Sequence, residues 1–233
     1  MISFKWRHFQ REIIMLVVRW YLSYSLSYRD IEEMMLERGI RVDHSTINRW
    51  VIYYAPLLEE EFRKTLKRKA GVSWRMDETY IKIKGVWHYL YRAVDKEGET
   101  IDFMLSKKRD EAAATAFFEK AMGSNGLPEK VTIDKSGANN AGMNAINLQL
   151  IILYFLGFPF MPIIIRQIKY LNNIVEQDHR SIKRIINPML GFKSFHSAEA
   201  TLAGIELYHM LKKGQHVDGR KSAAFEQFYA LAA

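Results

Sequence analysis

The chain has 233 residues and a formal net charge of +8, with 48% hydrophobic and 26% charged side chains. This length is enough for one large domain or two small ones with a sizeable core. Cysteine is absent, which excludes disulfides and thiolate zinc sites and fits a cytoplasmic protein. The sequence has no GxxxxGK[ST] or GxGxxG loop and no histidine pair three or four residues apart, so we expect neither bound nucleotide nor an HExxH zinc site.

The N-terminal part of the sequence predicts three helices. In the first, apolar residues recur at helical spacing over residues 9–24. The second begins after Ser27, a good N-cap, and ends at Gly39. The third covers about residues 45–55 and is expected to stop at Pro56, because proline disrupts a helix interior.

The second and third of these helices form a helix-turn-helix candidate, and we assign a DNA-binding domain to residues 1–56. Short polar and basic side chains near the start of such a helix can reach phosphates and base edges in the major groove. The residues expected to do so are Ser45, Thr46, Asn48 and Arg49. The basic net charge favours DNA over the alternative, which is an ordinary helical hairpin.

After a charged helical linker at residues 57–70, the pattern changes to strands and helices. The expected elements are strands at 74–84, 86–94 and 100–105, a helix at 111–122, a strand at 130–133, a helix near 143–152, a buried strand near 163–165, and helices at 172–186 and 196–212. This order predicts an α/β, RNase H-like domain with a mixed sheet. We assign it to residues 71–215, with a C-terminal tail at 216–233.

One segment of this domain, residues 148–165, contains no charged side chain. Its length is close to that of a membrane-spanning helix. Gly157, Pro159 and Pro162 interrupt it, and a straight helix is therefore not expected. We predict that the segment is buried in the core of the catalytic domain and does not cross a membrane.

Three acidic residues lie in contexts that suit a two-metal phosphoryl-transfer site. Asp77 lies in a predicted strand, Asp134 ends a short apolar strand, and Glu176 lies at the start of a predicted helix. Hard oxygen ligands on rigid elements would hold two Mg²⁺ (or Mn²⁺) ions that activate a water or a 3′-hydroxyl. The neighbouring Glu78 and Asp178 are expected to point elsewhere and to have structural roles.

Basic residues surround these acidic positions. If Glu176 opens a helix, three basic side chains follow at i+4, i+7 and i+8 on its face, where they would hold DNA phosphates. A solvated basic face is the alternative. The expected phosphate contacts are Lys135, Lys169, Arg180, Lys183 and Arg184.

Seven short motifs occur in order between residue 4 and about residue 215. They are Trp6-Arg7-His8-Phe9-Gln10, Val42-Asp43-His44-Ser45-Thr46, Met76-Asp77-Glu78-Thr79-Tyr80, Leu90-Tyr91-Arg92-Ala93-Val94-Asp95, Asp134-Lys135, Arg166-Gln167-Ile168-Lys169-Tyr170 and Gly191-Phe192-Lys193-Ser194. By these motifs the chain resembles DDE-type transposases of bacterial insertion sequences. It is most similar to the IS-six family, whose elements move by forming cointegrates.

The resemblance implies that Asp77, Asp134 and Glu176 are the metal-binding catalytic triad of a Mg-dependent polynucleotidyl transferase. It also implies that the helix-turn-helix recognises terminal inverted repeats, that target DNA is the second substrate, and that the protein is a homo-oligomer without nucleotide or membrane partners. The chain departs from the family in one respect. The stretch between Asp134 and Glu176 is longer than usual, and the surplus falls in residues 148–165. A catalytically decayed transposase or repressor that only binds DNA, and a nuclease that hydrolyses without joining strands, are the alternatives.

Overall fold

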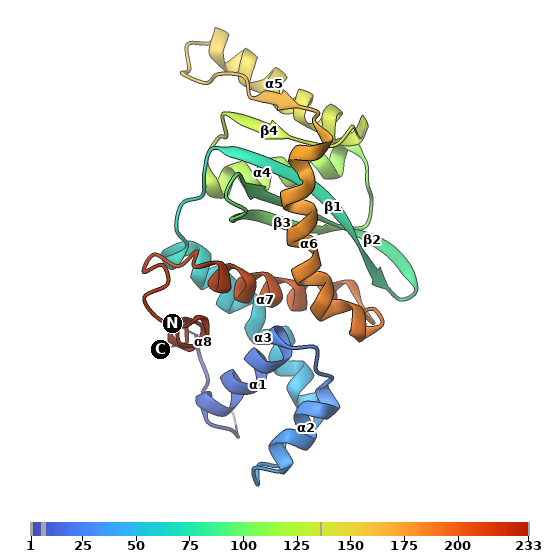
Figure 1. The fold of residues 1–233 in the computed structure, drawn as a ribbon, viewed down its shortest axis with the longest axis vertical. Helices are drawn as coiled ribbons and strands as arrows, with labels where there is room; N and C mark the ends of the chain where they lie inside the picture. Colours follow the sequence, from blue (N-terminus) through green and yellow to red (C-terminus); the bar gives the residue numbers. More distant parts are fainter. Residues whose placement is uncertain (1, 6–7, 136, 233) are drawn as a thin grey trace. The chain divides into compact units, whose positions relative to one another are not determined.

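The computed structural model describes residues 2–5, 8–135 and 137–232, with the backbone alone at Lys169. The chain forms two compact units. One, here called the helical unit, comprises Met1–Arg68 and Ser181–Ala233, and the other, the sheet unit, comprises Lys69–Arg180. Each unit is described separately, with the element labels of Figure 1.

The helical unit combines the N-terminal helices with those at the C-terminal end of the chain. Its elements are α1 (Arg11–Ser23), α2 (Tyr28–Leu36), α3 (His44–Glu61), the π-helix η1 (Phe62–Leu66), the 3₁₀-helix η3 (Asn187–Met189), α7 (Phe195–Lys213) and α8 (Ala224–Ala230). Helix α6 (Asn173–Ile186) begins in the sheet unit, and its residues from Ser181 onward belong to the helical unit.

The sheet unit contains five strands. Its elements are β1 (Ser73–Ile83), β2 (Val86–Asp95), β3 (Thr100–Ser106), α4 (Glu111–Asn125), β4 (Lys130–Thr132), α5 (Gly137–Phe155), β5 (Ile164–Arg166), the 3₁₀-helix η2 (Lys169–Asn172) and the first half of α6. The strand order is β3-β2-β1-β4-β5, with β1, β2 and β3 antiparallel and β4 and β5 parallel to β1. This mixed α/β arrangement confirms the RNase H-like fold predicted from the order of elements.

Local capping explains where the second N-terminal helix begins. The Ser27 hydroxyl accepts from the Asp30 N–H at 3.1 Å, and the Asp30 carboxylate accepts from the Ser27 N–H at 2.7 Å. This reciprocal pair satisfies two N–H groups at the start of α2. Gly39, three residues after the end of α2, adopts a left-handed φ of +73° that turns the chain toward α3.

The prediction that α3 stops at Pro56 is wrong. The helix continues to Glu61, and a π-turn extends it to Leu66. A proline inside a helix costs about 3 kcal/mol. The buried stripe continues beyond it with Leu58 and Phe62, however, and each large apolar side chain that leaves water contributes about 1.5–3 kcal/mol. Packing therefore outweighs the local penalty of the proline.

Helix α7 is the main packing partner of α3 in the helical unit. The two helices and α1 approach closely at Gly204, where an added Cβ would lie 2.5 Å from Leu22 Cδ1 and 2.8 Å from the Ala55 Cβ. Helix α7 lies at the end of the predicted catalytic domain, 71–215, and packs within the helical unit. The predicted domain bounds stay predictions.

The two faces of the sheet have different coverings. One face carries Trp74, Met76 and Tyr91 and packs against apolar residues of α4 and α5. The opposite face is covered by the first half of α6, which crosses in front of the strands in Figure 1 while α4 lies behind them. Alternation along β1 therefore separates an apolar face from a polar one.

Residues 148–165 depart from the prediction of a buried segment. Helix α5 contacts the core through Met143, Ile146 and Leu150, but its last turns extend beyond the strands (Figure 1), and most large apolar side chains in 148–165 are exposed. Leu150 and Ile163 are the buried exceptions among its large aliphatic residues. Among the described residues, the buried core cluster of the sheet unit extends along α5 as far as Leu150 and has no member in the last turn of the helix. In the part of the chain that the structure describes, no helix is long and apolar enough to cross a membrane.

We predict that Gly204→Val destabilises the protein by about 1–3 kcal/mol, because the added methyl groups overlap Leu22 and Ala55. The matched control is Gly123→Ala on α4, where a Cβ meets no atom within 4 Å. That change should stabilise the protein by up to about 1 kcal/mol through helix propensity. Urea unfolding of both variants measures the difference, and equal stability for the two would refute the close α1–α3–α7 contact.

Candidate active site

The register of the sheet brings two of the predicted acidic residues to one face. Arg75 on β1 pairs with Thr132 on β4, so these two residues share a face of the sheet. Asp77 lies two residues after Arg75, and Asp134 lies two residues after Thr132. Because side chains alternate along a strand, Asp77 projects from that same face. Asp134 lies just beyond the end of β4, and the chain there brings its carboxylate beside that of Asp77.

A third carboxylate completes the cluster. Among the residues that the structure describes, Asp77, Glu78 and Asp134 form a group whose ligand oxygens all lie within 4.8 Å of one another. The sequence analysis expects Glu78 to point away, and strand alternation does place it on the opposite side. Its carboxylate nevertheless reaches the group. Three oxygen donors so close together suit a hard divalent cation.

Arg109 bridges two of these carboxylates. Its guanidinium lies 3.3 Å from both oxygens of Glu78 and 3.1 Å from Asp134 Oδ2. The other oxygen of Asp134 accepts a hydrogen bond from the Asn139 side-chain amide at 3.1 Å. The orientation of the Asp134 carboxylate is thus fixed from two sides.

Helix α6 is attached to the polar face of the sheet next to this cluster. Asp178 forms a buried ion pair with Arg92 at 2.7 Å, and Arg92 is the register partner of Asp77. The Asn172 side-chain amide, just before α6, donates to the Met76 carbonyl at 3.3 Å. These contacts hold the start of α6 over β1.

The attachment of α6 determines where Glu176 and His179 lie. His179 is buried, with Nδ1 3.9 Å from Asp77 Oδ2. Glu176 occupies the first turn of α6, is exposed, and lies close enough to raise the pKa of Asp77. It does not belong to the group of oxygens within 4.8 Å.

The crowded carboxylates change the electrostatics of the site. Burial raises the pKa of Asp77 to about 7, and the negative charges of Glu78, Asp134 and Glu176 add to the effect. Burial also raises the pKa of Glu78, although Arg109 opposes this shift. The nearby guanidinium offsets only part of the carboxylate charge, and a divalent cation would offset more of it.

The residues predicted to contact DNA on α3 are held by local hydrogen bonds. The backbone N–H and hydroxyl groups of Ser45 and Thr46 donate to Asp43, the N-cap of α3. Arg49 donates to the Thr46 hydroxyl at 2.8 Å, and Asn48 bonds to Tyr28. Ser45 and Arg49 are exposed, whereas Thr46 and Asn48 are half-buried. Their role in DNA binding stays a prediction.

The other predicted phosphate contacts lie in the connection after β4 and on α6. Lys135 is exposed directly after Asp134, and Arg180 is exposed one turn after Glu176 on α6. Further along α6, Arg184 is exposed and Lys183 is half-buried. The side chain of Lys169 lies outside the described residues.

Sequence reasoning does not identify Glu78, Arg109 or Asn139 as parts of the site. Strand alternation places Glu78 on the side of β1 opposite Asp77, so a role for Glu78 in the site is not expected. Arg109 and Asn139 come from segments without a recognisable motif. One signal was available for Arg109. It immediately precedes Asp110, the N-cap of α4, in the short connection where the chain leaves β3.

We predict that Asp77→Asn stabilises the metal-free protein at pH 8 by roughly 2–4 kcal/mol, at about 1.4 kcal/mol per unit of pKa shift. Because the folded-state pKa is raised, the folded protein holds a proton that the unfolded chain releases. The stability of the wild type therefore falls as pH rises from about 4 to about 7.

Urea unfolding with a chelator at pH 4 and pH 8 measures this effect. The difference between variant and wild type should nearly vanish at pH 4, and Glu119→Gln, an exposed change on α4, should have little effect at either pH. An Asp77→Asn protein no more stable than the wild type at pH 8 would contradict the crowding of charge at this site.

Comparison with known proteins agrees with this geometry. A family model described as a DDE domain matches residues 71–215. The transposase for insertion sequence-like element IS431mec of Staphylococcus aureus is 43% identical over 213 residues, which is 91% of this chain and 90% of the relative. The transposase for insertion sequence element IS257 in transposon Tn4003, from the same species, is 42% identical over the same shares.

Two solved structures show weaker similarity. The HTLV-2 integrase catalytic core domain in complex with magnesium is 17% identical and covers 69% of this chain and 97% of its own, with a TM-score of 0.44. The catalytic core domain of BIV integrase is 15% identical, with 69% and 95% covered and a TM-score of 0.43. The match of the DDE domain and the identity over nine-tenths of the chain show that this protein belongs to the DDE-domain transposases of insertion sequences.

Proposed function

We propose that this transposase binds the terminal inverted repeats of its insertion sequence and catalyses Mg²⁺-dependent cleavage and transfer of DNA strands. The observation that carries the proposal is the group of Asp77, Glu78 and Asp134 oxygens on the sheet of the DDE domain. Carboxylate oxygens in such a group are the donors that Mg²⁺ or Mn²⁺ takes.

In this proposal Asp77 and Asp134 would hold two divalent ions together with Glu176. Such ions would supply activation of the attacking water or 3′-hydroxyl and stabilisation of the leaving oxygen. Glu176 has a long, exposed side chain on a helix that Asp178 and Arg92 already anchor. Its negative charge already contributes to the raised pKa of Asp77, and in this proposal rotation of the side chain brings its carboxylate to the two aspartates.

The remaining residues of the site position these ligands and the DNA. Arg109 and Asn139 orient Asp134, and His179 packs beside Asp77. Lys135 and Arg180, both exposed near triad members, hold backbone phosphates of the DNA. Ser45 and Arg49 on α3 read the ends of the element, and a homo-oligomer joins two such ends.

We predict that Asp77→Asn, Asp134→Asn and Glu176→Gln each reduce DNA cleavage more than a hundredfold while duplex binding stays nearly intact. A residue that only supports a metal ligand should cost about tenfold to a hundredfold, and Glu78→Gln is the matched comparison in that range. Cleavage and strand transfer of labelled end DNA with Mg²⁺ measure the loss, with binding followed by fluorescence anisotropy.

Strand transfer retained in any of the three variants would remove that residue from the triad. Retained binding together with no cleavage by the wild-type protein would instead favour a decayed transposase that only binds DNA. Products that are cleaved but never joined would favour a nuclease.

We predict that Arg109→Gln tightens Mg²⁺ binding several-fold and slows cleavage at least tenfold. Binding tightens because a cation at Asp134 no longer faces a guanidinium 3.1 Å from the same carboxylate. Cleavage slows because Asp134 loses one of its two orienting contacts. The rise in melting temperature with added Mg²⁺ measures the affinity.

Lys135→Gln is the matched control, because it removes the same charge from an exposed neighbour whose effect is screened by solvent. Arg109→Lys should restore part of the cleavage rate. Equal Mg²⁺ affinities for Arg109→Gln and Lys135→Gln would show that the Arg109 guanidinium does not oppose cation binding at Asp134.

A further inference from the structure

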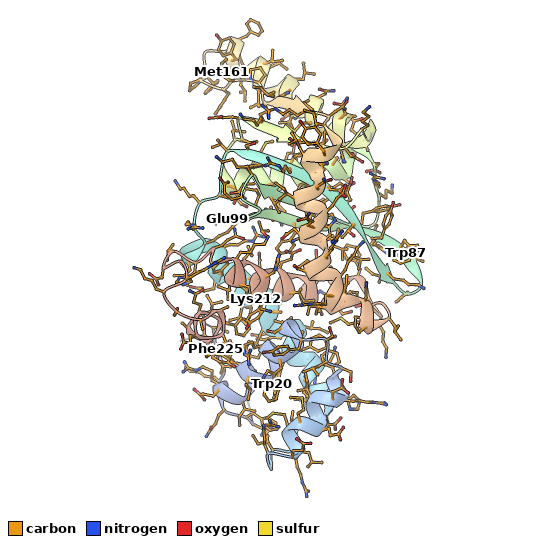
Figure 2. The ribbon with its side chains drawn as sticks, viewed as in Figure 1. Trp20, Trp87, Glu99, Met161, Lys212 and Phe225 are labelled. Atoms are coloured by element: carbon orange, nitrogen blue, oxygen red, sulfur yellow. The ribbon has the colours of Figure 1, made fainter. Side chains whose placement is uncertain are left out.

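The end of α5 and the turn after it carry an exposed apolar surface. Six large apolar side chains without a hydroxyl group between residues 148 and 161 are between 51% and 81% exposed, and we call them the α5 surface: Leu148, Ile152, Phe155, Leu156, Phe158 and Met161. Figure 2 shows Met161 at the far end of the sheet unit, beyond the strands. The first half of the same helix is buried against α4.

The α5 surface is held in one shape by hydrogen bonds. The turn after α5 is closed by the Phe158 N–H, which donates to the Leu153 carbonyl at 3.1 Å, and Gly157 provides the left-handed φ of +89° that this turn needs. The Asn147 side chain then bonds both the N–H and the carbonyl of Ile163, at 2.8 and 2.9 Å. The chain that follows the turn is thereby hydrogen-bonded to α5. The α5 surface is therefore an ordered surface and not a loose loop.

The area of the α5 surface is that of a protein interface. With about 150–250 Å² for a large side chain, the exposed fractions of the six residues sum to roughly 800 Å². A monomeric protein rarely exposes an apolar patch above roughly 600 Å². A stable interface buries about 800 Å² on each partner. The surface therefore has the size needed to hold a protein partner.

The charge pattern favours a second copy of this chain as that partner. Residues 148–165 contain no Asp, Glu, Lys or Arg, so the surface lacks the cations that nucleic acid requires. Two chains of net charge +8 repel each other where their basic flanks meet, whereas residues 71–165 carry 11 basic and 11 acidic side chains and have no net charge. An uncharged face lets them approach, and in a two-fold dimer the same patch meets itself, apolar against apolar.

The position of the surface leaves the active site open. Asn139, which orients Asp134, lies near the start of α5, whereas Phe155 is its last residue. At about 1.5 Å of rise per residue, roughly 24 Å of helix separates the two. A partner on the α5 surface would therefore not cover the carboxylate cluster.

We infer that the α5 surface is the contact through which two copies of this transposase associate. The inference rests on the proposed function, since the joining of two DNA ends requires two catalytic units. It also gives the extra residues between Asp134 and Glu176 a role.

The test compares self-association of full-length variants by sedimentation velocity without DNA. Phe155→Glu combined with Met161→Glu places four carboxylates in the interface of a dimer and should weaken association at least a hundredfold. Leu190→Glu is the matched control, because Leu190 is 89% exposed in the helical unit and should leave association unchanged. Circular dichroism confirms that each variant is folded.

A charge exchange sharpens the test. The corresponding Lys pair at positions 155 and 161 should also be monomeric alone, and an equimolar mixture of the Glu and Lys variants should regain the dimer. A monomeric wild type, or a dimer that survives both Glu changes, overturns the inference. Flotation of a monomeric wild type with uncharged phosphatidylcholine vesicles also overturns it, because a bilayer would then be the occupant.

Cleavage of a single labelled DNA end by the same proteins tests the proposed function separately. The Glu variant should still cleave one end while failing to join two. A wild type that dimerises through the α5 surface but cleaves no end would refute the function and leave the interface standing.

Discussion

The buried ion pair between Arg92 and Asp178 is the contact on which the arrangement of the sheet unit depends. It links β2 to α6, which lie far apart in the sequence, and removing one partner of such a pair costs about 3–5 kcal/mol, since the other charge stays buried. Arg92 is the register partner of Asp77, and the residue after Asp178 is His179, which faces Asp77. One pair therefore sets the position of the helix that carries Glu176 relative to the strand that carries Asp77.

The crowded carboxylates of the site destabilise the metal-free protein. Burial raises the pKa of Asp77, and the repulsion between carboxylates that share a small volume adds to this shift. Arg109 relieves this repulsion at Glu78 and Asp134. Part of the binding energy of a metal ion would then come from relief of this strain, so the empty and loaded proteins should differ in stability as well as in activity.

Much of this fold is predictable from the sequence because its signals are local. Alternation in β1 and the capping box at Ser27 depend on neighbouring residues, and both match the structure. The errors arise where contacts with residues distant in the sequence determine the structure. Pro56 does not end α3, because α7 covers the continuing apolar stripe, and residues 148–165 resemble a core segment although no described element covers most of them. Arg109 reaches the site from a segment well beyond Glu78 in the chain, which no local pattern reveals.

The packing of α7 against α3 has a consequence for synthesis of the protein. The apolar stripe of α3 is covered by a helix that begins only at Phe195, near the C-terminal end of the chain. During translation the N-terminal helices leave the ribosome first, and the face of α3 around Ala55, which Gly204 of α7 approaches, stays uncovered until most of the chain has emerged. A gene copy truncated before α7 would yield a fragment in which α3 lacks its main packing partner and exposes an apolar face that is prone to aggregate.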